Sequence, residues 1–495
     1  MSNQSGIRSQ LRSAWRLRPV KIGLAATCAI AIGSLTPAYL PQASPVWSLL
    51  QALHLAGQVG RVGGTVLSIC GVFALVDAWL RLRRHGLGQV HPLAIVALWV
   101  LPFLVSPPIF SHDAYSYGAQ GWMIHNGQNP YDGGPGLVPG PFSDYTPWVW
   151  RYTPAPYGPL GLQISHVLAV VSGGHPWLAA GLMRLPALAG VVAIVVLLPK
   201  LSDRLGFDTA TVTWFACLNP ILVIDYVGGA HNDAWMMGLV VIGLWLATYR
   251  RWWPAAAVVI GLAASIKQPA ILAAYVLPGL IRPLAGWRPI KPVLVWAGRA
   301  LAGVAVAAAT FILVSLASGL GFGWWDALGV PGSVGSISPS YLVGSLIQTL
   351  ASPGNSNYLV ATYRVGMIIG GALIVYFACR YALRQPIKAL AWSWVALALS
   401  ASALHSWYLL WGGLLWPFSA SRRGLWVGVG TVVLLVTYAG INLGDRNGYF
   451  AIIAAVVCLV AWLVQLWIYH IWRARHPRRP GDQLDATIKE AVAHE

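Results

Sequence analysis

The chain has 495 residues, of which 57% are hydrophobic and 9% are charged. A soluble globular domain carries about 25% charged residues, so this composition excludes a water-soluble protein and predicts one that lies mainly in lipid. The formal net charge of +18 comes from 32 lysines and arginines against 14 acidic residues. Many of these basic residues cluster in short segments between apolar runs, which is the positive-inside pattern of cytoplasmic loops and does not indicate a nucleic-acid partner.

The basic segments mark the cytoplasmic ends of an all-α, polytopic integral membrane protein. Apolar runs of the roughly 20 residues that a membrane-spanning helix needs recur along most of the chain. With the basic segments inside, about fourteen spans can be threaded, and both termini are predicted to be cytoplasmic. The basic segments are RSQLRSAWRLRPVK near the N-terminus, RLRRHG at 81–86, YRR at 249–251, SRR at 421–423 and WRARHPRRP at 472–480.

The first three spans lead to a polar stretch that is predicted to face the outside. These spans are predicted at residues 20–40, 61–81 and 92–110. The first outer loop then covers residues 111–176. Within it, the short apolar segment 161–174 is interpreted as an interfacial helix on the outer leaflet, because a crossing here would place the basic residues 200–204 outside.

The remaining spans alternate regularly and enclose a second outer loop at residues 320–357. Residues 252–282 are predicted to form two short apolar arms on either side of Lys267. The single transmembrane domain covers residues 1–472, and residues 473–495 are predicted to be a disordered cytoplasmic tail. The other spans are predicted at 177–199, 208–228, 231–249, 292–318, 358–380, 388–404, 407–420, 424–442 and 449–471.

All five cysteines lie inside apolar runs, and their spacing fits neither a disulfide framework nor a metal site. We therefore expect free thiols, and the sequence predicts no metal ligands. The cysteines are Cys28, Cys70, Cys217, Cys379 and Cys458.

The threading brings polar and ionisable residues from distant spans to the outer face. Ionisable groups at membrane depth are costly, so they are candidates for function. Their convergence on one side of the membrane predicts a single site there. The set includes Asp113, Tyr115, Asp225, His231, Asn232, Asp233, Lys267, Gln268, Arg364, His405, Trp407 and Tyr408.

Each of these residues also has a purely structural interpretation. Asp113 could cap the helix that follows it, and the segment 231–233 could cap the next span in the same way. Lys267 and Arg364 could extend toward the membrane surface with their apolar stems in lipid. The tryptophans and tyrosines could belong to an interfacial aromatic belt. Only the occurrence of all these residues at one face of the membrane favours a functional site.

That conjunction suits a substrate that is linked to lipid through phosphate. A carboxylate can take a proton from an attacking hydroxyl. A lysine or arginine can stabilise a phosphate as it departs. Aromatic faces, together with asparagine and glutamine side chains, can hold a sugar ring. These chemical roles alone do not fix the reaction.

Five segments in order along the chain resemble a known enzyme family. The resemblance spans roughly residues 90–470 and is to the polyprenol-phosphomannose-dependent α-1,6-mannosyltransferases. These are class-C (GT-C) glycosyltransferases that build the mannan core of lipomannan and lipoarabinomannan in actinobacterial envelopes. The segments are DAYSYGAQGWMIHNGQNPYDGGP at 113–135, RYTPAPYGPLGLQIS at 151–165, GGAHNDAWMMGL at 228–239, SIKQPAIL at 265–272 and HSWYLLW at 405–411.

The resemblance implies a GT-C bundle whose active site lies at the outer face of the plasma membrane. Asp113 matches the family's catalytic aspartate and would deprotonate the 6-hydroxyl of a lipid-anchored α-1,6-mannan acceptor. Attack would invert the β-linked mannose of polyprenyl-phosphate mannose, which is a donor substrate and not a cofactor; no cofactor is implied. One departure is that His405 and Ser406 precede Trp407, where the family usually has Gln-Pro.

The other site residues are assigned roles by inference from their chemistry. Lys267, Arg364 and His405 are predicted to bind the donor phosphate. The sugar or acceptor is predicted to contact Tyr115, Gln120, Asn126, His231, Asn232, Asp233, Gln268, Trp407 and Tyr408.

Three alternatives remain open at the level of sequence. The same scaffold could transfer another polyprenyl-linked sugar such as arabinofuranose. A lipid transporter or flippase would also bury polar groups, but it would carry them through the membrane midplane or show a repeated half, and neither pattern is evident. A non-catalytic membrane scaffold would not need the crowded polar set at the outer face.

Overall fold

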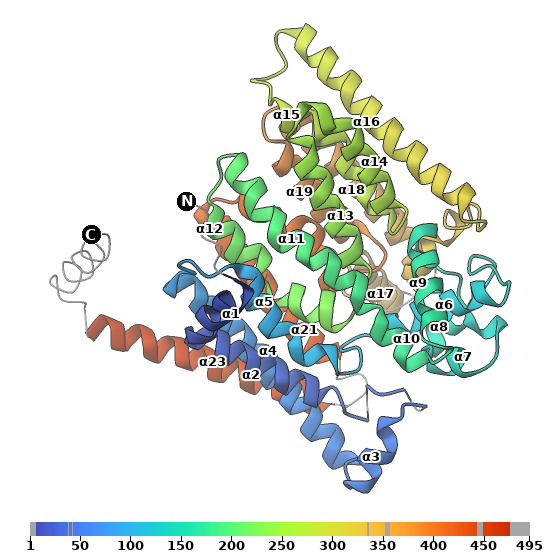
Figure 1. The fold of residues 1–495 in the computed structure, drawn as a ribbon, viewed down its shortest axis with the longest axis vertical. Coiled ribbons are helices and arrows are strands. Elements are labelled where there is room, and N and C mark those ends of the chain that lie inside the picture. The colour runs from blue at the N-terminus through green and yellow to red at the C-terminus, as the bar shows by residue number, and fades with distance from the viewer. Residues whose placement is uncertain are drawn as a thin grey trace.

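The computed structural model describes residues 6–37, 39–41, 43–333, 336–351, 357–442 and 449–475, and every regular element in this part of the chain is helical (Figure 1). The N-terminal elements are α1 (Ile7–Arg16), α2 (Arg18–Gly33), α3 (Val46–Ala52), α4 (Gln58–His85), α5 (Pro92–Val100) and the 3-10 helix η1 (Leu101–Leu104). Helix α2 packs along α4, and both lie at the lower left in Figure 1.

Short helices form the first predicted outer loop. They are α6 (Asp113–His125), η2 (Pro135–Leu137), α7 (Pro141–Tyr145), α8 (Trp148–Arg151) and α9 (Pro159–Val171). The next helix, α10 (Pro176–Leu182), begins the predicted span that follows the loop. Helix α6 packs against α9 and α10, and the group lies at the lower right in Figure 1. Proline at the first turn of α9 and of α10 favours a helix start there, because that position leaves no backbone hydrogen bond unmade.

The central helices carry most of the buried core. They are α11 (Arg184–Arg204), α12 (Thr209–Val212), the π-helical η3 (Thr213–Cys217) and η4 (Leu222–Gly228), α13 (Asp233–Ala247), η5 (Arg250–Trp252), α14 (Trp253–Ala264), η6 (Gln268–Val276) and α15 (Leu277–Ile281). Helices α11 and α13 cross at Gly190 and Gly238. A Cβ added to Gly238 would lie 2.4 Å from Gly190 Cα, so this close approach requires small residues.

The C-terminal helices surround this centre. They are α16 (Ile290–Ala317), η7 (Asp326–Ser333), α17 (Pro339–Ala351), α18 (Asn357–Tyr381), α19 (Pro386–Ser400), η8 (Ser406–Tyr408), α20 (Leu409–Gly413), η9 (Trp416–Phe418), α21 (Arg422–Asn442) and α23 (Tyr449–Arg475). Helix α23 returns to the N-terminal part of the chain and packs on α4. The predicted tail begins inside α23, and residues 476–495 lie outside the described residues.

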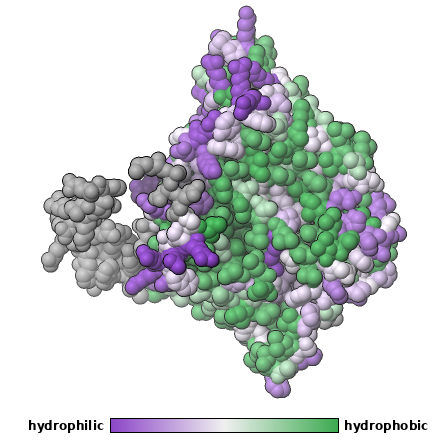
Figure 2. Space-filling model, in the orientation of Figure 1, coloured by the Kyte–Doolittle hydropathy of each residue, from purple (hydrophilic) through white to green (hydrophobic). Residues whose placement is uncertain are grey.

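The chain forms a multi-pass membrane protein. Four described helices or helix pairs are long and apolar enough to cross a membrane, and they match four predicted spans: Gln58–Arg83, Pro176–Arg204, Ile290–Ala317 and Asn357–Tyr381. The apolar side chains that they expose, and the wide apolar surface in Figure 2, suit contact with lipid. Several other predicted spans are shorter apolar helices, so the predicted total of about fourteen is not confirmed.

Two predicted spans are broken. The span expected at 208–228 consists of two helical segments that bend by 49° at residues 218–221. Pro220 lies in this break, and the side chain of Asn219 bonds backbone groups on both sides of it. The span expected at 407–420 is divided into η8, α20 and η9. By contrast, the predicted arms around Lys267 are present as α14 and the pair formed by η6 and α15.

The helix connections gather at two opposite ends of the bundle. At one end, the segments 205–208, 279–283, 384–388 and 417–420 line a common cavity of about 600 Å³. The positive-inside pattern predicts that these loops are cytoplasmic, and we call this the basic end. At the other end, Asn129 donates a hydrogen bond to the carbonyl of Leu320, and Ser336 donates one to that of Leu404. The predicted outer loops therefore lie together.

Candidate active site

Asp113 is the first residue of α6, and its side chain does not cap that helix. The N-cap position is His112, which makes no side-chain cap bond, and the Asp113 N–H donates to Ser111 Oγ at 3.1 Å. His112 contacts the carbonyl of Tyr39 through Nε2. A carboxylate in the first turn is favoured by the helix dipole. The Asp113 carboxylate lies beside His231 and is 17% exposed.

His231 lies beside this carboxylate and is fully buried. Its Nδ1 is 3.6 Å from Asp113 Oδ2, which is too long for a hydrogen bond, and neither ring nitrogen has a hydrogen-bond partner among the described residues. The ring stacks on Trp407 with centroids 3.7 Å apart, and Trp407 stacks on His405 at 4.5 Å. Buried polar atoms in proteins are almost always bonded. The imidazole of His231 therefore has unused hydrogen-bonding capacity beside Asp113.

Lys267 and Asp233 form a buried ion pair next to these rings. Lys267 Nζ donates to Asp233 Oδ2 at 2.8 Å, and Trp411 Nε1 donates to the other carboxylate oxygen at 2.7 Å. The ammonium also lies 4.5 Å from the centroid of the Tyr408 ring. Because a buried charge needs a partner, this arrangement allows a cation to remain charged inside the bundle. Two of the three ammonium protons remain for other acceptors.

The break between α14 and η6 positions Lys267. A proline at 269 limits helix continuation, and Lys267 itself has an extended backbone conformation. The loop containing Tyr157 packs directly on this break: the N–H of Gly158 bonds the carbonyl of Ile266 at 2.9 Å. A Cβ at residue 158 would lie 2.3 Å from the carbonyl oxygen of Ser265, so a glycine is required. Gln268 fixes the same contact by donating to the carbonyl of Pro156 at 3.3 Å.

Arg184 ties together the two segments that deliver Asp113 and His231. Its buried guanidinium donates to the carbonyls of Ser106 and Pro107 at 2.8 Å each, and to those of Val227 and Gly228 at 3.2 and 3.0 Å. The planar fork of arginine suits several fixed acceptors at once. The residues that precede Asp113 are thereby held against the residues that precede His231.

Burial changes the acid–base properties of the site. Burial raises the pKa of the Asp113 carboxyl to about 6, and the Lys267 charge opposes this increase. Burial lowers the pKa of His405, in the connection before η8, to about 4, with Lys267 adding to the decrease. At neutral pH, Asp113 is thus mostly ionised with a pKa near the working pH, as a general base requires. His405 is a neutral hydrogen-bonding group.

The structure brings together most, but not all, of the predicted site residues. Asp113, His231, Asp233, Lys267, His405, Trp407 and Tyr408 form one cluster. Asn232 and Gln120 are buried, and each has a side-chain oxygen without a hydrogen-bond partner among the described residues. Tyr115 is buried elsewhere on α6, against Tyr145 and Trp177.

Two predicted residues lie apart from this cluster. Asn126 is exposed at the C-terminal end of α6, where its side-chain amide bonds the carbonyl of Trp122. Arg364 is exposed on α18. The threading predicted the membrane level of Arg364 but could not give the direction in which it points.

Several residues of the cluster were missed by sequence analysis. Tyr117 and Tyr157 pack edge to face at 5.1 Å, and Trp411 holds Asp233. Tyr117 could have been found, because it follows Asp113 by one helical turn. Arg184 could also have been found, since an arginine at membrane depth is a functional candidate. Trp411 gave no such signal within its aromatic segment.

A third carboxylate, that of the buried Asp225, lies near this cluster. Ser406 Oγ donates to Asp225 Oδ2 at 2.7 Å, which ties η4 to the segment carrying His405 and Trp407. Within the described residues, no three histidine, cysteine or acidic side chains are grouped so as to hold a metal ion. The cluster as built can therefore supply one base, one paired cation and a wall of aromatic rings.

Comparison with known proteins identifies the family. Residues 20–282 match the model of the α-(1→6)-mannopyranosyltransferase N-terminal domain. The chain is 29% identical over 470 residues to α-(1→6)-mannopyranosyltransferase A of Mycobacterium tuberculosis, covering 90% of this chain and 89% of that protein. It is 29% identical over 522 residues to a probable α-(1→6)-mannopyranosyltransferase of Mycolicibacterium smegmatis, covering 95% and 91%.

A corynebacterial relative gives the same result. The chain is 25% identical over 453 residues to α-(1→6)-mannopyranosyltransferase A of Corynebacterium glutamicum, covering 83% of this chain and 90% of that protein. No solved structure shows a significant match. The family match covers more than half of the chain and includes Asp113, Asp233 and Lys267. The chain therefore belongs to the α-(1→6)-mannopyranosyltransferase family and is a glycosyltransferase.

Proposed function

We propose that this chain transfers mannose from polyprenyl-phosphate mannose to the 6-hydroxyl of a lipid-anchored α-1,6-mannan. The observation that carries the proposal is the pairing of Asp113, a carboxylate with a pKa of about 6, with the buried and unbonded imidazole of His231. The membership of the chain in a mannosyltransferase family supports the choice of sugar.

Asp113 acts as the general base in this reaction. Its carboxylate takes the proton of the acceptor 6-hydroxyl while the hydroxyl oxygen attacks C1 of the donor mannose. The bond between C1 and the phosphate oxygen breaks, and polyprenyl phosphate leaves with the electron pair. Attack opposite to the leaving group converts the β-linked donor into an α-linked product. A base with a pKa near the working pH suits this proton transfer.

Lys267 and His405 bind the departing phosphate. The ammonium has protons beyond the one given to Asp233, so it can donate to phosphate oxygens without losing its partner. His405 is neutral at pH 7 and contributes an N–H rather than a charge. Arg364 is omitted from this role because it is exposed on α18.

Aromatic rings and amides hold the sugars. Trp407 and Tyr408 are perpendicular to each other at 6.0 Å beside Lys267. Trp407 stacks on His231 and His405, and Tyr408 stacks on Trp411, so the two residues offer ring edges rather than faces to a sugar that carries phosphate. The free side-chain oxygen of Asn232 offers an acceptor for a sugar hydroxyl. His231 offers one nitrogen as a donor and the other as an acceptor. We assign Tyr115, Gln120 and Asn126 to the more distant acceptor chain.

The charge of the opposite end supports a site at the outer face of the plasma membrane. The basic loops gather at the end that lies away from Asp113, and basic loops face the cytoplasm in membrane proteins. Both termini are then cytoplasmic. In this arrangement, shorter helices such as α13, α14 and α19 are also spans, as in a GT-C bundle of about fourteen helices.

The first test of this proposal is the variant Asp113→Asn. It keeps the size and hydrogen-bonding capacity of the side chain but removes the base. We expect mannose transfer from polyprenyl-phosphate mannose to a short α-1,6-mannan to fall by about 10²- to 10⁴-fold, which is the usual contribution of a general base. The measurement is radiolabelled transfer by the purified protein.

The control is Asp132→Asn, which changes an exposed carboxylate in the same outer loop. It should retain full transfer. Turnover by Asp113→Asn equal to that of the control would remove Asp113 as the base. The same assay with polyprenyl-linked arabinofuranose tests the sugar: transfer of arabinofuranose in preference to mannose would contradict the proposed donor.

A further inference from the structure

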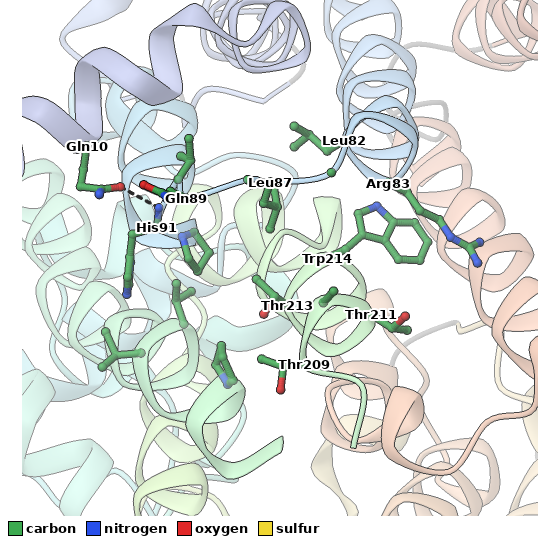
Figure 3. Close-up of a pocket in the computed structure, with 18 of the residues that line it drawn as sticks. Gln10, Leu82, Arg83, Leu87, Gln89, His91, Thr209, Thr211, Thr213 and Trp214 are labelled. Atoms are coloured by element: carbon green, nitrogen blue, oxygen red, sulfur yellow. Dashed lines mark hydrogen bonds between the residues drawn. The ribbon is translucent and has the colours of Figure 1, made fainter. Parts of the chain in front are cut away.

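A large cavity lies at the basic end of the molecule, away from the catalytic cluster. Its volume is about 720 Å³, and five segments line it: α1, the end of α4, the loop at residues 86–91, α11, and α12 with η3 (Figure 3). The proposed mechanism uses none of these residues. The proposed transfer reaction therefore does not explain this cavity.

The charge of this cavity is positive. Arg83 and Lys200 are its charged lining residues, and no acidic side chain is among the described residues that line it. His91 adds a hydrogen-bond donor. Its Nδ1 accepts from the N–H of Leu93 at 3.2 Å, so the ring proton resides on Nε2. Burial, and then Lys200, lowers the pKa of His91, which keeps the ring neutral at pH 7.

Arg83 is held in one conformation by two indole rings. Its guanidinium lies 4.8 Å from the ring centroid of Trp214 and 4.7 Å from that of Trp426. One terminal nitrogen is buried and has no hydrogen-bond partner among the described residues. The carboxylate of nearby Asp208 is occupied, because it caps α12 through the N–H groups of Ala210 and Thr211. The cation is thus fixed beside the cavity without an acid bonded to it.

The rest of the lining is apolar, which selects for an amphipathic ligand. Leu82 and Leu87 line the cavity from the side of α4, and Val195 and Val196 line it from α11. Figure 3 shows Leu82, Leu87 and Trp214 bordering the same space as the polar groups. A small inorganic anion would leave these apolar side chains uncovered. A phosphate that carries an acyl-glycerol group would cover both kinds of surface.

Helix α1 places the mouth of the cavity at a membrane surface. It carries Arg8, Arg12 and Arg16 and also exposes Ile7 and Trp15, which is the composition of a helix that lies in the interface of an anionic membrane. The helix is attached to the rim of the cavity, since the backbone N–H of His91 donates to Gln10 Oε1 at 2.8 Å. The cavity thus opens at the level of lipid head groups.

We propose that this cavity is a binding site for the phosphate head group of an anionic phospholipid, with Lys200 and His91 as its cationic and hydrogen-bonding wall and with Arg83 fixed at its edge, behind Trp214. The lipid belongs to the leaflet that faces the basic end. It is separate from the donor lipid, whose phosphate is handled at the other end of the bundle. The site would anchor α1, α4 and α11 to that leaflet.

Lipid retention by the full-length protein tests this proposal. The protein is purified in detergent that contains equal amounts of phosphatidylglycerol and phosphatidylcholine, and bound lipids are counted by native mass spectrometry. We expect tightly bound phosphatidylglycerol in the wild type. One basic residue near an anionic surface is worth about a fivefold change in binding, so Lys200→Gln should lower retention by about that factor and Lys200→Glu should lower it further.

The matched control is Lys291→Gln, which changes an exposed lysine at the start of α16, outside the lining of the cavity. It should leave retention unchanged. Equal retention by Lys200→Glu and the control would overturn the site. Glycerol 3-phosphate distinguishes a lipid from a free phosphate. If it displaces the phospholipid at equal concentration, with the same dependence on Lys200, the cavity binds a soluble phosphate and the lipid assignment fails.

Discussion

Charged side chains are neutralised differently at the two ends of this membrane protein. At the catalytic end, Lys267 and Asp233 are buried and bonded to each other, with Trp411 completing the pair. At the basic end, Lys200 is exposed and Arg83 is covered by indole rings without a bonded acid. Buried charge must be satisfied within the fold, whereas charge at the membrane surface can be satisfied by lipid. This difference is consistent with the proposed catalytic site at one end and the proposed phospholipid-binding site at the other.

The largest effect that this comparison predicts is on the buried pair. Lys267→Met would leave Asp233 ionised and buried without its cation, which costs about 3–5 kcal/mol. We expect a marked decrease in the thermal unfolding midpoint in detergent, together with loss of transfer. Lys291→Met, at an exposed position of the basic end, should change neither.

A double variant separates stability from catalysis at this pair. Replacing both partners, as in Lys267→Met with Asp233→Asn, removes the uncompensated charge and should recover much of the lost stability. It should not recover transfer, since the cation for the donor phosphate is still absent. Recovery of transfer would contradict the role of Lys267 in phosphate binding.

A smaller effect is expected for the arginine that positions the site. Arg184→Lys cannot reach all four carbonyls that the guanidinium bonds. The segments that carry Asp113 and His231 should then shift, and a displacement of 1 Å can lower the rate roughly 100-fold. We expect kcat to fall more than the donor affinity. The control on the same helix is Arg204→Lys, which loses a long bond to Thr248 and the guanidinium contact with the Tyr249 ring, both far from Asp113, and should retain its kcat.

The smallest effect concerns pH. The raised pKa of Asp113 means that the base becomes protonated as the pH falls through about 6, so kcat/KM should fall about tenfold per pH unit below that value. Burial disfavours the ionised carboxylate, so Asp113→Asn should unfold at a higher temperature than wild type at pH 7.5. That difference should shrink as the pH falls toward 3, where the wild-type carboxyl is mostly protonated in both the folded and the unfolded states. A constant difference across this range would show that Asp113 is not desolvated.

Much of this organisation could be predicted from the sequence, because membrane spans obey simple rules of length and charge. The arms around Lys267 and the long spans at Ile290–Ala317 and Asn357–Tyr381 lie where the apolar runs predict them. The break at Asn219 and Pro220 was missed, although an Asn-Pro pair is a recognised turn signal. Hydrophobicity is averaged over a window, so it does not detect a local bend.

The sequence predicted that the site residues lie at the same end of the membrane spans, but it did not predict which of them contact one another. The threading placed Asp113, His231, Lys267 and His405 at one end, and the structure groups them. The bond between Ser406 and Asp225 joins residues 181 positions apart, and no local pattern encodes such a pairing. The same limit applies to Arg364, whose direction depends on how α18 is rotated about its axis.

The Lys267–Asp233–Trp411 arrangement has a consequence for biosynthesis. Asp233 and Lys267 lie before α16 in the chain, and Trp411 lies after it, in α20. As the chain leaves the ribosome, the acidic and basic partners enter the membrane well before the indole that completes their hydrogen bonds. The centre is therefore finished late, when α20 docks against α13. A chain that stops before α20 would contain Asp113, Asp233 and Lys267 but not Trp411, so its active centre would be incomplete. Activity therefore requires that the chain has been translated and inserted at least through α20.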